Sequence, residues 1–230
     1  MNKACKDSLV VVPYRDRSEQ LNKFIHTFNK VYTPALKSVD LCIVEQTPGR
    51  KFNRGLIKNI GGIYAREQHY KYIYFNDVDI LCNGDVLGSA HAQTDWDAAT
   101  LFSAHRQCFG GAVKLTTDSF HICNGFPSDL WGWGLEDRSL YYRYLINDMS
   151  IRPWTDNTAN VEILNHSPVE RQWPYKGLML DRYNAETTNL NCGDTDKQLR
   201  YIQQSGVNTA DYTVLETTVQ DNITRITVQV

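Results

Sequence analysis

The sequence predicts an α/β fold with a mostly parallel, doubly wound sheet flanked by helices and a C-terminal hairpin. Short β-branched segments alternate with helix-periodic segments through the first 80 of the 230 residues, and such alternation favours parallel strands joined by crossover helices. The last residues instead alternate Val, Thr and Ile, which is typical of an antiparallel hairpin. The length suits one sizeable domain with its own core, so we expect residues 1–230 to form a single domain.

The first half supplies three strands and two helices in alternation. Pro13 ends the first apolar run, and Ser18 is a candidate N-cap for the helix that follows. The second helix contains Gly61 and Gly62, which lower its helix propensity. In order, we expect a strand at residues 9–12, a helix after residue 18, a strand at 39–44, a helix at 53–66 and a strand at 70–75.

The second half is less regular. We expect a strand at residues 110–115, a helix at 136–147 and a hairpin at 212–230 that turns at Asp221-Asn222. The six cysteines include no CxxC pair, so zinc-knuckle and thioredoxin interpretations fail. Cys42 and Cys82 end apolar runs and are expected to be buried thiols.

Composition and missing motifs exclude several functional classes. A net charge of −2 with scattered basic residues gives no reason to expect a nucleic-acid partner. No run approaches about 18 apolar residues, so we expect no membrane span, and the N-terminus lacks the apolar core of a signal peptide. GxSxG, Walker, GxGxxG and HExxH motifs are missing, which leaves triad hydrolases, kinases and dinucleotide oxidoreductases without motif support.

The most informative segment is Trp-Gly-Trp-Gly-Leu-Glu-Asp at residues 131–137. Trp131 and Trp133 offer flat apolar faces on which a sugar ring can stack, and the glycines allow a ligand to approach closely. Glu136 and Asp137 add carboxylates that can accept a proton. The segment therefore predicts a carbohydrate site with a general base.

Two acidic residues follow the third expected strand. Period-two geometry places Asp77 and Asp79 on one side of the strand and Val78 on the other. Two carboxylates at a strand end suit Mg²⁺ or Mn²⁺ bridging a diphosphate, whereas the simpler interpretation is a solvated turn. Because ligands of parallel sheets bind beyond the carboxyl ends of the strands, we expect this segment to lie near residues 13–17.

Arginines supply candidate phosphate ligands at two places. Arg15 and Arg17 follow the first strand, and guanidinium groups suit phosphate; an exposed charged loop is the commoner alternative. Residues 52–54 open the second helix, where backbone N–H groups favour anions, although Asn53 can simply cap that helix. His166 follows an apolar run, and a lone histidine is more often structural than metal-bound. The other five histidines are interpreted as structural: His26, His69, His91, His105 and His121.

These segments follow one another in a fixed order: residues 12–17, 52–55, 77–79, 109–111, 124–127, 131–137 and 165–167, then 206–209 and 223–228. In this order the chain resembles the β-1,4-galactosyltransferase family of inverting glycosyltransferases. The resemblance spans nearly the whole chain, and the tryptophan–glycine segment joined to the others is its most specific part.

The resemblance implies a GT-A type fold with a Rossmann-like sheet, a Mn²⁺ cofactor and transfer of galactose from UDP-Gal to a hydroxyl, O4, of a saccharide or glycoconjugate acceptor. It implies that Asp79 and His166 bind the metal. It implies Asp137 as general base, with Glu136 binding sugar hydroxyls and Trp133 on a mobile loop that closes over the donor. The implied acceptor contacts are Trp131, Glu136, Asp137 and Arg138. The implied donor contacts are Pro13, Arg15, Arg17, Phe52, Arg54, Asp77, Val78, Cys108, Gly110, Gly111 and Trp133.

Three departures from the family pattern bear on these roles. Ile163 stands where a methionine ligand is usual, and isoleucine cannot bind a metal. Arg138 replaces an acceptor-facing carboxylate, which points to an unusual or acidic acceptor. Cys108 stands where galactose users carry tyrosine, and its smaller side chain leaves room for the N-acetyl group of UDP-GalNAc, an alternative donor.

Two further alternatives stay open at this point. Ile163 and Arg138 also fit a UDP-sugar- or glycan-binding module that has lost catalysis. The chain begins close to its first strand without an anchor, so we expect a soluble protein. A bacterial or viral enzyme is expected to be cytoplasmic, and an excised eukaryotic catalytic domain is expected to derive from the Golgi lumen.

Overall fold

The computed structural model describes residues 7–132, 134–165, 186 and 188–230. No helix among these residues combines the length and the apolar character needed to cross a membrane. The elements, in chain order, are β1 (Ser8–Tyr14), α1 (Ser18–Thr27), the π-helix η1 (Phe28–Tyr32), α2 (Thr33–Leu36), β2 (Val39–Gln46), α3 (Arg54–Glu67), β3 (Tyr72–Asn76), β4 (Ile80–Cys82), α4 (Gly84–Ala92), β5 (Ala98–Phe102), β6 (Ala112–Thr116), α5 (Thr117–Ile122), α6 (Glu136–Ile146), η2 (Thr158–Asn160), β7 (Val161–Ile163), α8 (Thr195–Ile202), η4 (Val207–Thr209), β8 (Thr213–Gln220) and β9 (Ile223–Gln229).

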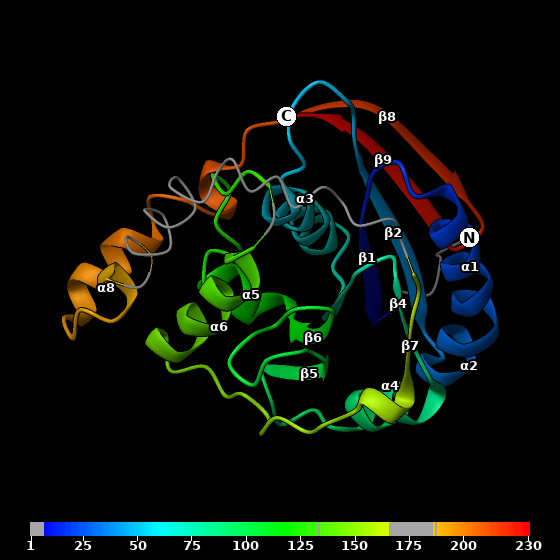
Figure 1. Ribbon diagram of the computed structural model, residues 1–230, viewed down its shortest axis with the longest axis horizontal. Helices are drawn as coiled ribbons and strands as arrows, with labels where there is room; N and C mark the ends of the chain where they lie inside the picture. Colours follow the sequence, from blue (N-terminus) through cyan, green and yellow to red (C-terminus); the bar gives the residue numbers. More distant parts are fainter. Residues whose placement is uncertain (1–6, 133, 166–185, 187) are drawn as a thin grey trace.

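Seven of the described strands form the central sheet, in the order β5-β6-β3-β1-β2-β9-β8. Its centre is parallel, because β1 pairs with β2 and β3, and β2 pairs with β9, in parallel register. The strands added at the two edges run antiparallel to their neighbours. Figure 1 shows the β8–β9 hairpin along one edge, with α1 and α2 on the other side of the sheet from α3, α5 and α6. The predicted fold class and terminal hairpin are therefore confirmed.

Alternate residues of β1 enter two separate cores. Leu9 and Val11 pack into the core shared with α3, α5 and α6, whereas Val10 and Val12 pack into the core shared with α1, α2 and α4. All four side chains are fully buried. A strand that is covered on both faces has a continuous apolar sequence. The sequence of β1 is therefore continuously apolar, whereas that of the C-terminal hairpin alternates between apolar and polar residues.

Two boundaries differ from the sequence-based expectation. β1 continues past Pro13, because its pairing with β3 stops at Val11–Phe75, and a proline two residues later removes no hydrogen bond from that ladder. Ser18 is the first residue of α1 and not its cap. Arg17 occupies the N-cap position and makes no side-chain cap hydrogen bond there.

Two glycines place α3 directly on its neighbours. A Cβ added at Gly61 would lie 2.2 Å from Val11 Cγ1, and one added at Gly62 would lie 2.2 Å from Phe120 Cε1. No side chain fits in either gap. The glycines that lower the helix propensity of this segment therefore permit close packing of α3 against β1 and α5, and α3 is the helix that carries the cations of the site.

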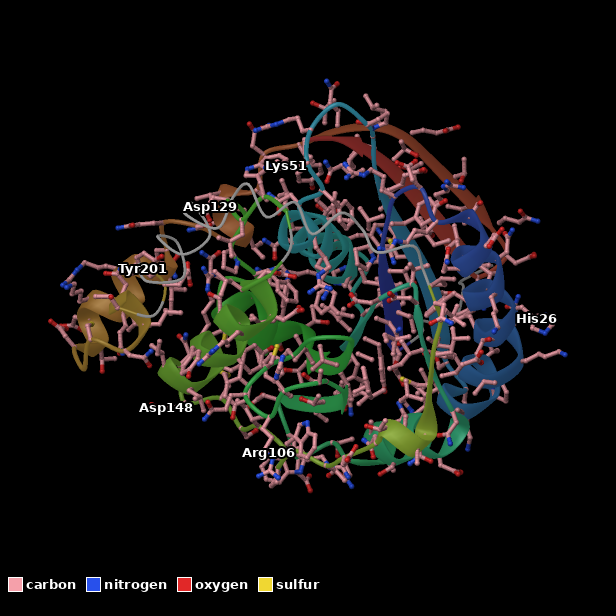
Figure 2. The ribbon with its side chains drawn as sticks, viewed as in Figure 1. His26, Lys51, Arg106, Asp129, Asp148 and Tyr201 are labelled. Carbon is pink, nitrogen blue, oxygen red and sulfur yellow. The ribbon has the colours of Figure 1, made fainter. Side chains whose placement is uncertain are left out.

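Side chains interpreted as structural from the sequence lie in ordinary structural settings. Cys42 and Cys82 are buried free thiols, as predicted. His26 points from α1 into solvent at the edge of the molecule (Figure 2). His91 Nδ1 lies 3.2 Å from the hydroxyl of Tyr74.

Candidate active site

The carboxyl ends of β1 and β3 lie side by side in the sheet, paired in parallel register up to Val11 and Phe75. The chain leaves β1 toward Arg17 and leaves β3 toward Asp79. These two side chains meet, with Arg17 Nη1 3.3 Å from Asp79 Oδ2. The expectation that residues 13–17 and 77–79 share one edge of the sheet is confirmed. Pro13 itself is buried within β1.

Residues 77–79 form a turn between β3 and β4. The backbone N–H of Ile80 donates to the Asp77 carbonyl oxygen at 3.0 Å, so the prediction from extended period-two geometry was wrong. Asp77 faces the cations of α3 and Asp79 faces Arg17. Their side chains are only 15% and 17% exposed, and Val78 is buried. The alternative of a solvated turn is therefore also wrong.

A second group of contacts links the loop after β1 to the loop before α3. Arg15 Nη1 donates to the Arg50 carbonyl oxygen at 2.8 Å, and the Arg15 guanidinium lies 5.2 Å from the centre of the Phe52 ring. The Arg50 guanidinium lies 3.8 Å from the centre of the Trp131 ring. The Gly132 backbone N–H donates to the Phe52 carbonyl oxygen at 2.9 Å. The arginine segment, residues 50–54 and the first tryptophan therefore lie together.

Asn53 caps α3, which was the simpler interpretation of residues 52–54. Its Oδ1 accepts a hydrogen bond from Leu56 N at 2.9 Å, and its Nδ2 donates to the Ser128 carbonyl oxygen at 2.8 Å. Gln46 Oε1 accepts from Asn53 N at 2.8 Å, while Gln46 Nε2 binds the carbonyl of Lys51, on the loop labelled in Figure 2. These contacts fix the start of α3 and with it the neighbouring Arg54.

Arg54 binds three carboxylates at once. Its Nη1 lies 2.8 Å from Asp77 Oδ2, its Nε donates to Glu136 Oε1 at 2.5 Å, and its Nη2 donates to Asp137 Oδ2. One turn further along α3, Lys58 Nζ donates to Asp137 Oδ1 at 2.9 Å and lies 3.5 Å from Asp77 Oδ1. We call these five residues the carboxylate cluster. Glu136 and Asp137 begin α6, and both are buried.

The two neighbouring carboxylates of α6 have opposite pKa shifts. Burial opposes ionisation of Asp137, but Arg54 and Lys58 outweigh it and hold the pKa of Asp137 below its ordinary value. For Glu136, burial and the charge of Asp137 outweigh the attraction of Arg54 and raise its pKa. Burial lowers the pKa of Lys58, yet Asp137 and Asp77 more than compensate, so the pKa is raised and the ammonium form persists. Of the two carboxylates, Asp137 is therefore the one that loses its proton more readily.

The segment from Cys108 to Gly111 lies against the carboxylate cluster. A Cβ added at Gly110 would lie 3.2 Å from Asp137 Oδ2 and 3.4 Å from Cys108 Sγ. Burial, followed by the charge of Asp137, raises the pKa of Cys108 to about 11, so its thiol stays protonated. Gly111 has φ +82° and a Cβ there would lie 2.7 Å from Phe102 Cδ1. Glycine at 111 is thus required by space and by backbone conformation, and a side chain at 110 would crowd Asp137.

The backbone before α6 adopts conformations that most residues avoid. Gly132 and Gly134 have φ +96° and +106°, and the non-glycine Leu135 has φ +78°. Such strain at a non-glycine residue is often found at functional sites. On the outer side of α6, Arg138 lies 5.6 Å from the centre of the Tyr142 ring. A pocket there is lined by Leu135, Arg138, Ser139, Tyr142, Glu186, Leu190 and Asn191.

Two predicted site residues, Trp133 and His166, lie outside the described residues. The described chain just before His166 reaches the 77–79 turn, since Leu164 N donates to the Asp79 carbonyl oxygen at 2.8 Å. Asn165 accepts a hydrogen bond from Gln20 Nε2 through its carbonyl oxygen at 3.1 Å.

Lys58 is the member of the cluster that sequence reasoning missed. With Asn59, it interrupts the apolar run Leu56, Ile57 and Ile60 of α3, and it lies one helical turn from Arg54. Asn59 was missed as well. Its side chain donates to the Phe126 carbonyl oxygen at 2.8 Å and accepts from the Phe126 N–H at 2.9 Å. A charged or amide side chain inside an apolar helical run was the available signal for both.

Two family models match most of the chain. Residues 2–87 match the N-terminal region of glycosyl transferase group 7, and residues 91–167 match a model described as the N-terminal domain of galactosyltransferase. Bovine β-1,4-galactosyltransferase 1 is 25% identical over 228 residues, which are 96% of this chain and 54% of the bovine protein. Xylosylprotein 4-β-galactosyltransferase of Caenorhabditis elegans is 31% identical over 149 residues, 62% of this chain and 51% of the nematode protein. The chain thus spans about half the length of these curated relatives.

A solved structure shares the fold. It is a mutant of Drosophila β-1,4-galactosyltransferase 7 in complex with manganese, UDP-Gal and xylobiose, with a TM-score of 0.70 and 21% identity, covering 96% of this chain and 93% of the fly chain. Both family models and the order of the site segments lead to one conclusion: the chain belongs to the β-1,4-galactosyltransferase family and has the GT-A fold.

Proposed function

We propose that residues 1–230 form one catalytic domain of an inverting glycosyltransferase. It moves galactose, or GalNAc, from a UDP-sugar to a hydroxyl, O4, of an acceptor sugar. The observation that carries this proposal is the buried Asp137 carboxylate, which shares Arg54 and Lys58 with Asp77 and so lies beside the 77–79 turn that Arg17 contacts. The Drosophila relative solved with UDP-Gal, manganese and xylobiose supports the same substrate classes.

Asp137 is the general base in this mechanism. Its carboxylate takes the proton of the acceptor hydroxyl as the oxygen forms a bond to the anomeric carbon of the donor. The bond from that carbon to the diphosphate breaks on the opposite face, so the configuration inverts and UDP leaves. Glu136, whose pKa is raised, keeps more of its proton than Asp137 and is suited to hydrogen bonding with sugar hydroxyls.

The donor is bound by residues at the carboxyl ends of β1 and β3. Arg15 and Arg17 bind the diphosphate, and Phe52, which Arg15 already contacts, packs against the nucleoside. Arg54 contributes its charge from within the carboxylate cluster. Further donor contacts come from Pro13, Asp77, Val78, Gly110 and Gly111, with Trp133 closing over the sugar to exclude water.

The carboxylates of the 77–79 turn fit a divalent cation. Asp77 and Asp79 offer hard oxygen donors, and Asp77 Oδ1 is buried and accepts no hydrogen bond from the described residues. Among those residues no group of three or more His, Cys, Asp and Glu side chains is gathered for a metal. Asp79 and His166, the two ligands that the family resemblance implies, would hold Mn²⁺. When bound, the ion stabilises negative charge on the leaving diphosphate.

Two positions bear on substrate choice. The side chain of Cys108 is smaller than the tyrosine of galactose users, which supports use of UDP-GalNAc as well as UDP-Gal. Trp131 and Arg138 stand on either side of Glu136 and Asp137 in the sequence and are assigned to the acceptor side. A guanidinium at 138 favours an acceptor that carries negative charge near the reacting sugar.

A donor panel tests the proposal. UDP-Gal, UDP-GalNAc, UDP-Glc, UDP-GlcNAc and UDP-Xyl are each incubated with Mn²⁺, with and without simple sugar acceptors, and UDP release is measured. Acceptor-dependent release from UDP-Gal or UDP-GalNAc is expected. A protein that binds UDP-sugars but transfers to no acceptor would instead be the catalytically inactive binding module.

A further inference from the structure

Lys58 is a buried cation in the middle of a helix that otherwise packs against the sheet. Its side chain is 1% exposed, and the α3 residues on either side of it, Ile57 and Asn59, are fully buried. A lysine is almost never buried to this extent unless it is paired. The position therefore requires an explanation beyond packing.

The partners of Lys58 are carboxylates of the site. Its Nζ donates to Asp137 Oδ1 at 2.9 Å, lies 3.5 Å from Asp77 Oδ1 and lies 5.0 Å from the centre of the Phe126 ring. Arg54, four residues earlier on α3, binds the other oxygen of Asp137, Oδ2. The base is thus held at both oxygens by two different cations on one face of one helix.

Holding both oxygens fixes the plane of the Asp137 carboxylate. The terminal torsion of aspartate is otherwise broad and roughly two-fold, so a carboxylate bound only through Oδ2 can rotate. With Lys58 on Oδ1 in the interior, Oδ2 stays on the side of Gly110, where an added Cβ would lie 3.2 Å away. Orientation of this kind matters because a base must reach the proton that it removes.

We propose that Lys58 is a positioning residue that orients the Asp137 carboxylate toward the acceptor hydroxyl. This inference rests on the proposed transferase function and on Asp137 as its base. Lys58 does not touch substrate and takes no part in proton transfer. It also favours the ionised form of Asp137, together with Arg54 and against the burial of the site. The other titratable groups that face the cluster are Asp77, Glu136 and the thiol of Cys108.

Three variants of Lys58 separate positioning from folding. Lys58→Met removes the charge and the donor at similar size, Lys58→Gln keeps an N–H donor, and Lys58→Arg keeps the charge. Lys114→Met is the matched control, because Lys114 is also buried but donates to the carbonyl oxygens of Ala90 and Gln93. If Lys58→Met does not fold, the kcat and acid limb of Lys58→Gln are compared with those of wild type instead, because glutamine also removes the charge.

For Lys58→Met, we expect kcat to fall by about 10- to 100-fold, the scale of a misplaced catalytic group, with the Kd for UDP unchanged. The acid limb of the pH–kcat profile should move up by about one pH unit, because a cation beside a carboxylate lowers its pKa by about 1–3 units. Lys58→Arg should retain more activity than Lys58→Met. Lys114→Met should lose stability without moving the acid limb.

Two kinetic results would overturn the inference. One is a folded Lys58→Met variant, or Lys58→Gln in its place, with wild-type kcat and acid limb, and the other is a parallel loss of kcat and UDP affinity, which would place Lys58 at the nucleotide. A wild-type chain that transfers no sugar would refute the proposed function instead. Crystal structures of the wild type and Lys58→Met then decide the inference, since an unchanged Asp137 carboxylate in the variant would contradict it.

Discussion

Replacing Asp137 with asparagine tests the proposed base while keeping the size of the side chain. An amide cannot take a proton from the acceptor hydroxyl, and a general base contributes about 10²–10⁴-fold to rate. That factor corresponds to about 3–5 kcal/mol of activation free energy. We therefore expect kcat to fall by about that factor. UDP-sugar binding should survive, because Arg15, Arg17 and Phe52 make their contacts with Arg50 and the 77–79 turn and not with Asp137.

The same substitution changes the charge balance of the carboxylate cluster. Removing one partner of a buried ion pair can cost about 3–5 kcal/mol of stability. Three contacts reduce that cost here. Lys58 still has Asp77 as an ion-pair partner at 3.5 Å, and the asparagine oxygen can still accept one hydrogen bond. Glu136 also loses the negative neighbour that helps to raise its pKa. We expect a loss of about 1–3 kcal/mol in the free energy of unfolding, the range for a weakened buried polar contact.

The assay measures UDP release at saturating donor and acceptor, with the Kd for the donor from calorimetry and stability from chemical denaturation. Asp221→Asn, in the exposed β8–β9 turn, is the matched control and should behave as wild type. Glu136→Gln distinguishes the two acids and should retain more activity than Asp137→Asn. Normal turnover in Asp137→Asn, or a larger loss in Glu136→Gln, would refute the assignment of the base.

Three further predictions follow from the same site. The pKa of Asp137 is lower in the folded state than the value of about 3.9 in the unfolded chain. Asp137 therefore stabilises the fold above that value, and the stabilisation is lost as the pH falls through the folded pKa. The stability difference between wild type and Asp137→Asn, measured by denaturation, should shrink below about pH 4. Gly110→Ala places a methyl 3.2 Å from Asp137 Oδ2 and should lower kcat by about tenfold or more, while calorimetry should show unchanged affinity for UDP. A wild-type kcat would show that this methyl does not displace the Asp137 carboxylate. EDTA should abolish UDP release, and Asp79→Ala should not recover it at ordinary Mn²⁺ concentrations, whereas full activity in EDTA would disprove the metal assignment.

The parts of the fold that the sequence predicts are those set by local pattern. Continuous apolar runs identified the parallel strands, and alternating Val, Thr and Ile identified the hairpin of β8 and β9. The meeting of Arg17 with Asp79 followed from topology alone, because parallel neighbours bring their carboxyl ends to one edge. The turn at residues 77–79 escaped prediction, because a single hydrogen bond from Ile80 to Asp77 ends the extended geometry that the period-two argument assumed.

The carboxylate cluster was only partly predictable, because its members come from three distant places in the chain. Glu136 and Asp137 were visible in a motif. Lys58 belongs to no motif, and only its contacts with Asp77 and Asp137 place it in the cluster. Arg54 was expected at the nucleoside, whereas its guanidinium lies among the carboxylates.

Helix α3 connects the packing of the fold to the chemistry of the site. Gly61 and Gly62 allow its C-terminal half to lie directly on β1 and α5, while Asn53 and Gln46 fix its start. Its position is therefore set at both ends by contacts that involve no substrate. The cations between those ends are held rigidly against the start of α6, and two like charges one turn apart would destabilise an isolated helix. That cost is tolerated only with the carboxylates of Asp77 and of the start of α6 in place, so the geometry of the proposed base and the docking of α3 depend on one another.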